Sequence, residues 1–322
     1  MGREGQWIEQ PVSQPINIAE WKGDEEFEVY PEGARDKSLL KSPEQSEYGF
    51  LIPNHRYLFK HSFARHPDQF WTEIIAYQVG CMLEIPVPPA FVAYDSDNNI
   101  CGALIEWFVG YPGQPEDRFF AGGDIMVSII HGFDRKKGRQ HNFSSIEKHF
   151  SALKSVGFHV FDWLNYWCDM LLFDALIGNT DRHQDNWGVL WNQNTGNVAY
   201  MAPVFDNGTS LGYEILESKM ANFSNPARMQ AYINKGRHHL RWHVDDEYQS
   251  QHLDLLMKLS ERHPALKDRI KNKLALFQDE HLKAMMTLCT QYPVNIPLSQ
   301  ARANFVCELV NERFQIIRNK II

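Results

Sequence analysis

The feature that most constrains the fold of this chain is a long apolar run, FHVFDWLNYWCDMLLFDALI at residues 158–177, followed directly by the polar segment GNTDRHQDN at residues 178–186. A helix that is apolar almost all round belongs at the centre of a domain. Gly178 suits its end, because glycine takes the left-handed conformation that helix ends often need. The polar segment that follows has three uses open to it: holding a metal, supplying a base, or capping the helix.

Composition sets broad limits on the class of protein. The chain has 322 residues, of which 43% are hydrophobic, enough for one large or two modest domains. The formal net charge of −8 argues against a broad nucleic-acid-binding surface, since such surfaces are usually basic. The five cysteines are scattered and form no CxxC pair, which favours a reducing compartment. No apolar run is long enough to span a bilayer, so we expect a soluble cytoplasmic protein that binds neither nucleic acid nor membrane directly.

The chain changes character near residue 108. Before it, short strand candidates surround one helix, predicted at residues 68–83; the strands are expected at 27–30, 48–52, 56–60, 90–94 and 101–108. After it, a hairpin is expected from residues 187–191 and 198–205, and helices from about residue 247 onward. The sequence of residues 117–150 indicates no chemical role, and the position of the segment suggests an insertion or a helix pair. We therefore expect a small, mostly antiparallel N-terminal lobe at residues 1–108 and a mostly helical C-terminal lobe at residues 109–322.

Three polar residues can meet at one point after the apolar helix. Asp181 and Asn186 share the loop, and the predicted hairpin returns the chain to Asp206. Phosphoryl transfer from ATP needs such a set: one carboxylate accepts or orients the proton of the attacking hydroxyl, while a carboxamide and a second carboxylate hold Mg²⁺ through oxygen. The pattern therefore indicates Asp181 as the catalytic residue and Asn186 with Asp206 as metal ligands.

The N-terminal half contains matching residues for the nucleotide. Lys60 ends a predicted strand, and Glu73 lies in the next helix, so the two can form the ion pair that holds the α- and β-phosphates of ATP. The last strand of this half ends in a linker at Glu106, Trp107 and Phe108. We expect the backbone of that linker to bind adenine.

The motifs resemble those of the HipA-like serine/threonine kinases, the toxin kinases of bacterial toxin–antitoxin systems. The matching segments are GARDKSLLK, YLFK, TEIIAYQVGCMLEIPVPP, ALIEWF, FDALIGNTDRHQDNWGVL and MAPVFDNG, which together span roughly residues 29–212. The resemblance implies an α+β, two-lobed protein-kinase-like fold, with an ATP-binding N-terminal lobe and a catalytic C-terminal lobe. It also implies Ser/Thr protein kinase activity with ATP and Mg²⁺.

The same resemblance assigns further roles. It implies a phosphate-covering loop that begins at Gly33 and includes Ala34, Arg35, Lys37 and Ser38. Members of the family carry regulatory autophosphorylated serines there, and Ser38 and Ser42 are the candidates in this chain. The implied substrate is a protein, with an aminoacyl-tRNA synthetase as the known type, and the implied partner is a DNA-binding antitoxin. Because little sequence precedes residue 29, the chain resembles the short form of the family, HipT, in which the small N-terminal domain is a separate polypeptide.

Several alternatives stay open at this stage. The segment DRHQDN also satisfies the DRHxxN pattern of phosphatidylinositol kinases, so a lipid acceptor is one alternative, and a non-catalytic nucleotide-binding adaptor is another. A small-molecule phosphotransferase usually has His two residues before the catalytic Asp, where this chain has Asn179. We interpret His183 as structural. The basic stretches DRKKGRQH and NKGRHHLRWH are either solvated loops or contacts for an acidic or phosphorylated partner. His238, His239 and His243 lack the ligand spacing typical of a zinc site.

Overall fold

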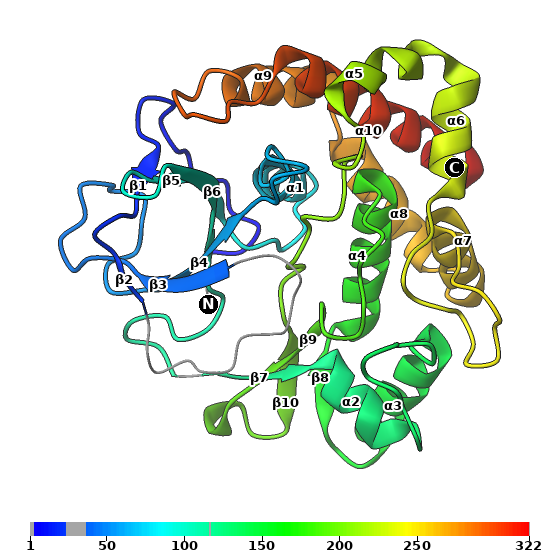
Figure 1. Ribbon diagram of the computed structural model, residues 1–322. Coiled ribbons are helices and arrows are strands. Elements are labelled where there is room, and N and C mark those ends of the chain that lie inside the picture. Colours follow the sequence, from blue (N-terminus) through cyan, green and yellow to red (C-terminus); the bar gives the residue numbers. More distant parts are fainter. Residues whose placement is uncertain (1–2, 24–36, 116, 322) are drawn as a thin grey trace.

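A curled six-stranded sheet forms the N-terminal half of the molecule in the computed structural model, which describes residues 3–23, 37–115 and 117–321 (Figure 1). The strand order is β1-β5-β6-β4-β3-β2, with β1 parallel to β5 and the other neighbours antiparallel. The strands are β1 (Ile16–Asn17), β2 (Lys22–Gly23), β3 (Lys37–Lys41), β4 (Arg56–His61), β5 (Ala90–Asp95) and β6 (Ile100–Glu106).

The predicted helix of this half is α1 (Trp71–Met82), which packs against β5 and β6. Buried residues occur on nearly every side of α1, because the sheet covers one face and C-terminal helices cover another. In β4, buried and partly exposed positions alternate over the first four residues, as a half-buried strand requires. This alternation and the position of Glu73 in the first turn of α1 place Lys60 and Glu73 on facing elements.

Two predicted strands of this half have different outcomes. Residues 27–30 lie outside the described residues. The strand expected at residues 48–52 was wrong: these residues form turns and bends, and β4 pairs instead with β3, where Lys37 lies opposite Lys60, and with β6. The apolar side chains that suggested a strand instead cover the sheet, because Tyr48, Phe50 and Leu51 pack into the cluster around Tyr57.

The apolar run forms the central helix of the C-terminal part, α4 (Trp163–Ile177). Every residue from Trp167 to Ile177 is buried, and Gly178 ends the helix with a left-handed φ of 69°. The helix starts later than predicted, because residues 159–161 form β8 (His159–Phe161), which pairs in parallel with β10 (Val198–Met201). Asp162, with a φ of 53°, turns the chain from this strand into the helix.

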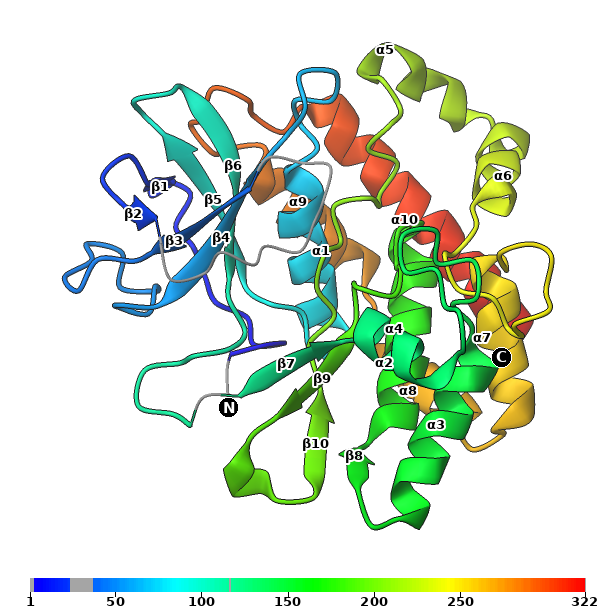
Figure 2. The ribbon, with the colours of Figure 1, turned by 60° about the horizontal axis from the view of Figure 1, so that its bottom comes forward.

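A second sheet and a ring of helices complete the C-terminal part (Figure 2). This sheet has the order β7-β9-β10-β8, in which β9 (Gly188–Trp191) and β10 are the predicted hairpin. The segment at residues 117–150 contains β7 (Arg118–Ala121) and the helix pair α2 (Gly122–Ile129) and α3 (Phe143–Ser155). The remaining helices are α5 (Glu217–Met220), α6 (Pro226–Lys235), α7 (His252–Arg262), α8 (Leu266–Leu276), α9 (Asp279–Cys289) and α10 (Gln300–Ile321).

The two halves share one large hydrophobic core. The cluster that surrounds α4 extends to the buried face of α1 and to residues of β5 and β6. After α9 the chain returns to the N-terminal half, where Trp71 donates through Nε1 to the carbonyl of Ile296 at 3.0 Å and Tyr292 donates to the carbonyl of Gln10 at 2.9 Å. No helix in the described part of the chain is both long and apolar enough to cross a bilayer.

Candidate active site

The loop after α4 is folded around the backbone of Asp181. The side chain of Asn179 accepts a hydrogen bond from the Asp181 amide at 2.9 Å. The Asp181 carbonyl accepts two hydrogen bonds, from the His183 amide at 2.8 Å and from Nδ2 of Asn186 at 2.7 Å. Because the side-chain nitrogen of Asn186 is used in this way, its side-chain oxygen, Oδ1, is the atom left to hold a cation. The loop therefore fixes Asp181 and Asn186 relative to each other.

Arg182 joins this loop to the segment that carries Asp206. Its guanidinium is fully buried and bonds Asp174 on α4 at 2.8 and 3.0 Å, the side chain of Asn207 at 2.6 Å and the carbonyl of Phe205. Burial alone would raise the pKa of Asp174, but Arg182 and the hydrogen bond from His238 outweigh burial and lower the pKa to about 2. The carboxylate is therefore charged, and it holds Arg182 in place.

Lys60 lies between the two halves of the molecule. Its Nζ atom is 2.9 Å from Oε1 of Glu73 and 2.9 Å from Oδ1 of Asp206. The second carboxylate oxygen of Glu73 accepts the amide of Asn207 at 3.0 Å. The structure thus brings together the predicted lysine, its predicted helix partner and the predicted metal-binding aspartate, although Asp206 is 146 residues from Lys60 in the sequence.

The backbone at Asp206 is strained, and its neighbours hold it. Asp206 has a φ of 57°, the left-handed region that residues other than glycine rarely adopt. The side chain of Asn179 donates to its carbonyl at 3.4 Å, and Asn207 is fixed by Glu73 and Arg182. Such strain persists only where the surroundings determine the conformation, and it is typical of functional sites.

A cavity of about 930 Å³ opens beside Lys60 and Asp206, between β4 and the hairpin of β9 and β10. Six of the predicted site residues line it: Lys37, Lys60, Trp107, Phe108, Asn186 and Asp206. Asp181, Glu73, Ser38 and Glu106 do not line it. Gly33, Ala34 and Arg35 lie outside the described residues.

Two backbone amides of the predicted adenine-binding linker already form hydrogen bonds within the protein. The amide of Glu106 donates to the carbonyl of Pro89 at 2.8 Å, and that of Trp107 donates to the carbonyl of Arg56 at 3.0 Å. The Glu106 carboxylate is buried and bonds the hydroxyls of Tyr57 and Tyr111, so it does not face the cavity. The linker residues whose side chains reach the cavity are Trp107, Phe108 and Val109.

Aromatic rings form the apolar wall of the cavity. Phe108 stacks on Phe205, the residue before Asp206, with ring centroids 5.1 Å apart, and Phe119 of β7 packs edge-on against both. Leu58 of β4 lines the same cavity. An aromatic wall of this kind suits a flat aromatic ligand, because stacked and edge-on arrangements are favourable for ring systems. The cavity thus has an apolar end at Phe108 and a charged end at Lys60 and Asp206.

The charged end suits Mg²⁺ in its chemistry. Asp206 and Asn186 present a carboxylate and an amide oxygen to one cavity, and hard divalent cations prefer such oxygen ligands. The described residues contain no group of three or more His, Cys, Asp or Glu side chains arranged to hold a metal, so the protein would supply only part of the coordination shell. Mg²⁺ commonly takes its other ligands from phosphate oxygens and water.

One family model matches most of the chain. The model of the HipA-like C-terminal domain matches residues 30–271, a range that contains every predicted site residue. The chain belongs to this HipA-like family. Among curated protein sequences, none matches the chain significantly.

Solved structures show that the fold of this HipA-like chain is that of a kinase. The proinflammatory kinase CtkA of Helicobacter pylori is similar over 95% of this chain and 98% of its own, with a TM-score of 0.73 and 17% identity. HipA of Shewanella oneidensis MR-1, solved with HipB and operator DNA, is similar over 97% of this chain and 68% of its own, with a TM-score of 0.51 and 15% identity. At these identities the likeness concerns the fold, and it confirms the predicted α+β, kinase-like architecture.

The sequence analysis did not identify the buried residues that hold the loop at residues 178–186 in place. Arg182 and Asp174 form a buried ion pair, and His252 of α7 bonds the carbonyl of Asn179 at 2.6 Å through Nε2. One signal was available: Asp174 sits inside an apolar helix, and a buried charge there needs a partner. The His238 and His243 side chains, considered together as zinc ligands, instead bond Asp174 and Ser144.

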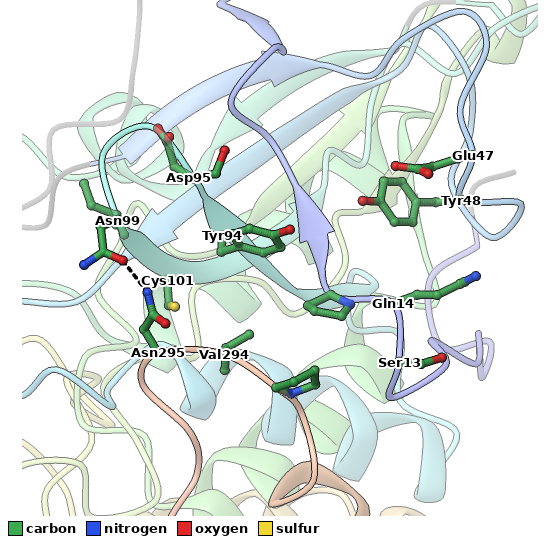
Figure 3. Close-up of a pocket in the computed structure, with 14 residues that line it drawn as sticks. Ser13, Gln14, Glu47, Tyr48, Tyr94, Asp95, Asn99, Cys101, Val294 and Asn295 are labelled. Carbon is green, nitrogen blue, oxygen red and sulfur yellow. Dashed lines mark hydrogen bonds between the residues drawn. The ribbon is translucent and has the colours of Figure 1, made fainter.

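A second cavity, of about 580 Å³, lies at the β1 edge of the N-terminal sheet (Figure 3). Tyr94 and Asp95 of β5 border it, and a hydrogen bond between Asn99 and Asn295 joins the β5–β6 turn to the segment after α9. None of the predicted site residues lines this cavity. The predicted site residues that line either cavity therefore all line the one beside Lys60 and Asp206.

Proposed function

We propose that this HipA-type protein is an ATP- and Mg²⁺-dependent serine/threonine protein kinase. The observation that carries the proposal is the position of Lys60, with Nζ 2.9 Å from both Glu73 and Asp206 at the charged end of a cavity that Asn186 also lines. Phosphoryl transfer from ATP uses such a combination, a cation for the nucleotide phosphates beside oxygen ligands for a metal, and the combination supports the proposal. The aromatic end of the cavity, at Phe108 and Phe205, then takes the adenine ring.

The residues have distinct roles in this proposal. Lys60 binds the α- and β-phosphates, and Glu73 keeps its ammonium group oriented. Asn186 and Asp206 hold Mg²⁺, which neutralises phosphate charge when bound. Asp181 accepts the proton of the acceptor hydroxyl as the oxygen of that hydroxyl bonds to the γ-phosphorus and the bond to the β-phosphate oxygen breaks. ADP and a phosphorylated Ser or Thr are the products.

Intact mass spectrometry after incubation with Mg²⁺–ATP tests the activity. We expect mass to be added in steps of one phosphate in the wild type and not in Asp181→Asn, which is nearly isosteric and should keep its melting temperature. Asp97→Asn, an exposed carboxylate in the turn between β5 and β6, serves as the matched control. ATP binding without transfer to the chain, to proteins or to peptides would support an adaptor. Transfer only to phosphatidylinositol in vesicles would support a lipid kinase.

The geometry separates the two candidate autophosphorylation sites. Ser38 is exposed on β3, next to the cavity-lining Lys37. Ser42 is only 2% exposed; its hydroxyl donates to the carbonyl of Ile52 at 2.6 Å and accepts the amide of His55 at 3.0 Å. A phosphate on Ser42 would require this segment to open. We therefore propose Ser38 as the autophosphorylated residue, and peptide mapping of the phosphorylated chain checks this directly.

The family and the fold suggest the biological setting. HipA of S. oneidensis was solved with HipB, and we propose a HipB-like antitoxin as the partner of this chain. The proposed acceptor is a protein, with an aminoacyl-tRNA synthetase as the first candidate. A cytoplasmic location fits the five cysteines, none of which forms a disulfide. Co-purification of the chain with the product of a neighbouring gene would test the partner.

A further inference from the structure

The two basic stretches of the sequence lie side by side in the structure. The amide of Arg241 donates to the carbonyl of His141 at 3.0 Å, the amide of Phe143 donates to the carbonyl of Arg241 at 2.9 Å, and that of Ser144 donates to the carbonyl of Trp242 at 3.0 Å. These bonds join the end of DRKKGRQH and the two residues that follow Asn142 to the last part of NKGRHHLRWH. Two segments far apart in the sequence therefore form one basic surface.

This surface is attached to the catalytic loop. Gln184 donates to the carbonyl of Arg135, and Arg135 bonds the carboxylate of Asp185 at 2.7 and 2.9 Å. A side chain on Gly138 would lie 2.3 Å from Gln184 and 2.8 Å from His239, so the loop packs closely against both. Residues 135–139 are thus held next to the segment that carries Asp181.

The arginines of the surface differ in how their charge is balanced. Arg135 forms ion pairs with both Asp124 and Asp185. Among the described residues, by contrast, no carboxylate lies within ion-pair distance of Arg139 or Arg241. The Nε atom of Arg241 donates to the carbonyl of Asp246 at 3.1 Å, while an oxygen of the Asp246 carboxylate accepts the amides of Trp242 and His243.

The environment of Arg241 is unfavourable for its charge. The residue is only 9% exposed. Burial lowers the pKa of Arg241, and the nearby positive charge of Arg139 lowers it further, whereas the Asp246 carboxylate, which forms no ion pair with Arg241, acts in the opposite direction; the net shift is downward. Two guanidinium groups close together repel each other, and a further anion between them would relieve that repulsion.

We propose that Arg139 and Arg241 form a recognition site for an acidic side chain of the acceptor protein. This inference rests on the proposed protein kinase activity and specifies its substrate: a Ser or Thr with Asp, Glu or a phosphorylated residue nearby. Guanidinium groups bind carboxylates and phosphates in bidentate fashion, which gives direction as well as attraction. The position beside the catalytic loop then orients the acceptor segment toward Asp181.

A protein segment fits this site better than a nucleic acid. The whole chain has a formal net charge of −8. Acidic residues border the basic surface, namely Asp134, Asp245, Asp246 and Glu247. A polyanion with charge along its whole length would meet these carboxylates, whereas a short segment with one or two acidic residues would not.

The test measures binding separately from phosphoryl transfer. A short fluorescein-labelled peptide with one Ser and two neighbouring Asp residues, the Ser–Asp peptide, is titrated with the full chain at low salt, and fluorescence anisotropy gives the Kd. We expect salt-dependent binding that Arg139→Glu weakens by roughly tenfold, because two charge contacts are lost or reversed. Lys271→Glu, the same charge reversal at an exposed position on α8, should leave the Kd unchanged, and a peptide with Lys in place of Asp should not bind.

Arg139 is exposed, so its replacement should not disturb folding, and a melting temperature checks this. With the Ser–Asp peptide as acceptor, Arg139→Glu should raise KM and leave kcat nearly unchanged. Equal affinity of Arg139→Glu and wild type for the peptide would overturn the inference, whether or not the protein is a kinase. Tighter binding of a single-stranded RNA, lost in Arg139→Glu, would also overturn it in favour of nucleic acid. Failure of the kinase proposal would appear separately, as wild type that transfers no phosphate to itself, to proteins or to peptides.

Discussion

Lys60 and Asp206 form an ion pair at the charged end of the cavity, with Nζ 2.9 Å from Oδ1. The Lys60 side chain is 7% exposed and that of Asp206 is 30% exposed, so the pair is accessible from the Asp206 side. Glu73, which is 3% exposed, holds the same ammonium group from the interior. The lysine is thus held by Glu73 from the interior and by Asp206 at the cavity surface, a position that suits its proposed role in binding nucleotide phosphates.

The first prediction concerns Lys60→Ala. We expect ATP affinity to fall and kcat/KM to fall by roughly a hundredfold or more, because a preorganised cation at the phosphates is lost. Titration with a fluorescent ATP analogue and initial rates measure the two effects. Lys41→Ala, at an exposed position at the end of β3, is the matched control. Since Lys60→Ala leaves Glu73 buried without its cation, the double variant with Glu73→Gln should recover stability but not activity. Wild-type rates in the double variant would place the nucleotide elsewhere.

Local patterns predicted the elements that bring the candidate site together. The 56–60 strand and the following helix placed Lys60 near Glu73, and the loop and hairpin after the apolar helix returned the chain to Asp206. These are short-range relationships, because each depends on the length of one element and one turn. The pairing of β3 with β4 could not be found in this way, since a strand at residues 37–41 looked like a loop and residues 48–52 looked like a strand.

The supporting contacts of the site depend on tertiary packing and were therefore not predictable. Arg182 looked like one of several polar loop residues, but it is fully buried because Asp174 and Asn207 surround it. The beginning of the apolar run was interpreted as helix, whereas residues 159–161 pair with β10, a strand distant in the sequence. Long-range strand pairing and buried charge partners leave no periodic signal in one sequence.

The second prediction concerns the Asp174–Arg182 pair. Arg182→Met should lower the free energy of unfolding by about 3–5 kcal/mol, because Asp174 is left as a buried charge with one partner removed. The double variant Asp174→Leu/Arg182→Met should regain much of that loss, since no unpaired charge remains. It should not regain phosphoryl transfer, because the bonds from Arg182 to Phe205 and Asn207 are still missing. Urea unfolding and intact mass measure the two properties. Activity in the stable double variant would show that Arg182 does not position the loop.

The third prediction is a pH dependence of stability that originates at His252. Its Nε2 atom lies 2.6 Å from the carbonyl of Asn179, an acceptor, so Nε2 carries the proton of a neutral ring. Burial, with the nearby His238 and Arg313, lowers the pKa of His252 to about 3 from the usual 6.5. Between these values the unfolded chain binds a proton that the folded chain does not. The contribution of His252 is therefore complete above pH 6.5 and decreases as the pH falls toward 3.

His252→Gln isolates this effect, because the amide of Gln can still donate to the Asn179 carbonyl but does not titrate. Below pH 6.5, the free energy of unfolding of the wild type should fall more steeply than that of the variant, by about 1.4 kcal/mol per pH unit. Urea unfolding at several values down to about pH 5 gives both slopes. The buried His141 and the half-buried His239, whose pKa values are also lowered, leave a slope in the variant. His281→Gln, at an exposed position, is the control, and equal slopes for His252→Gln and wild type would show that His252 is not held neutral against Asn179.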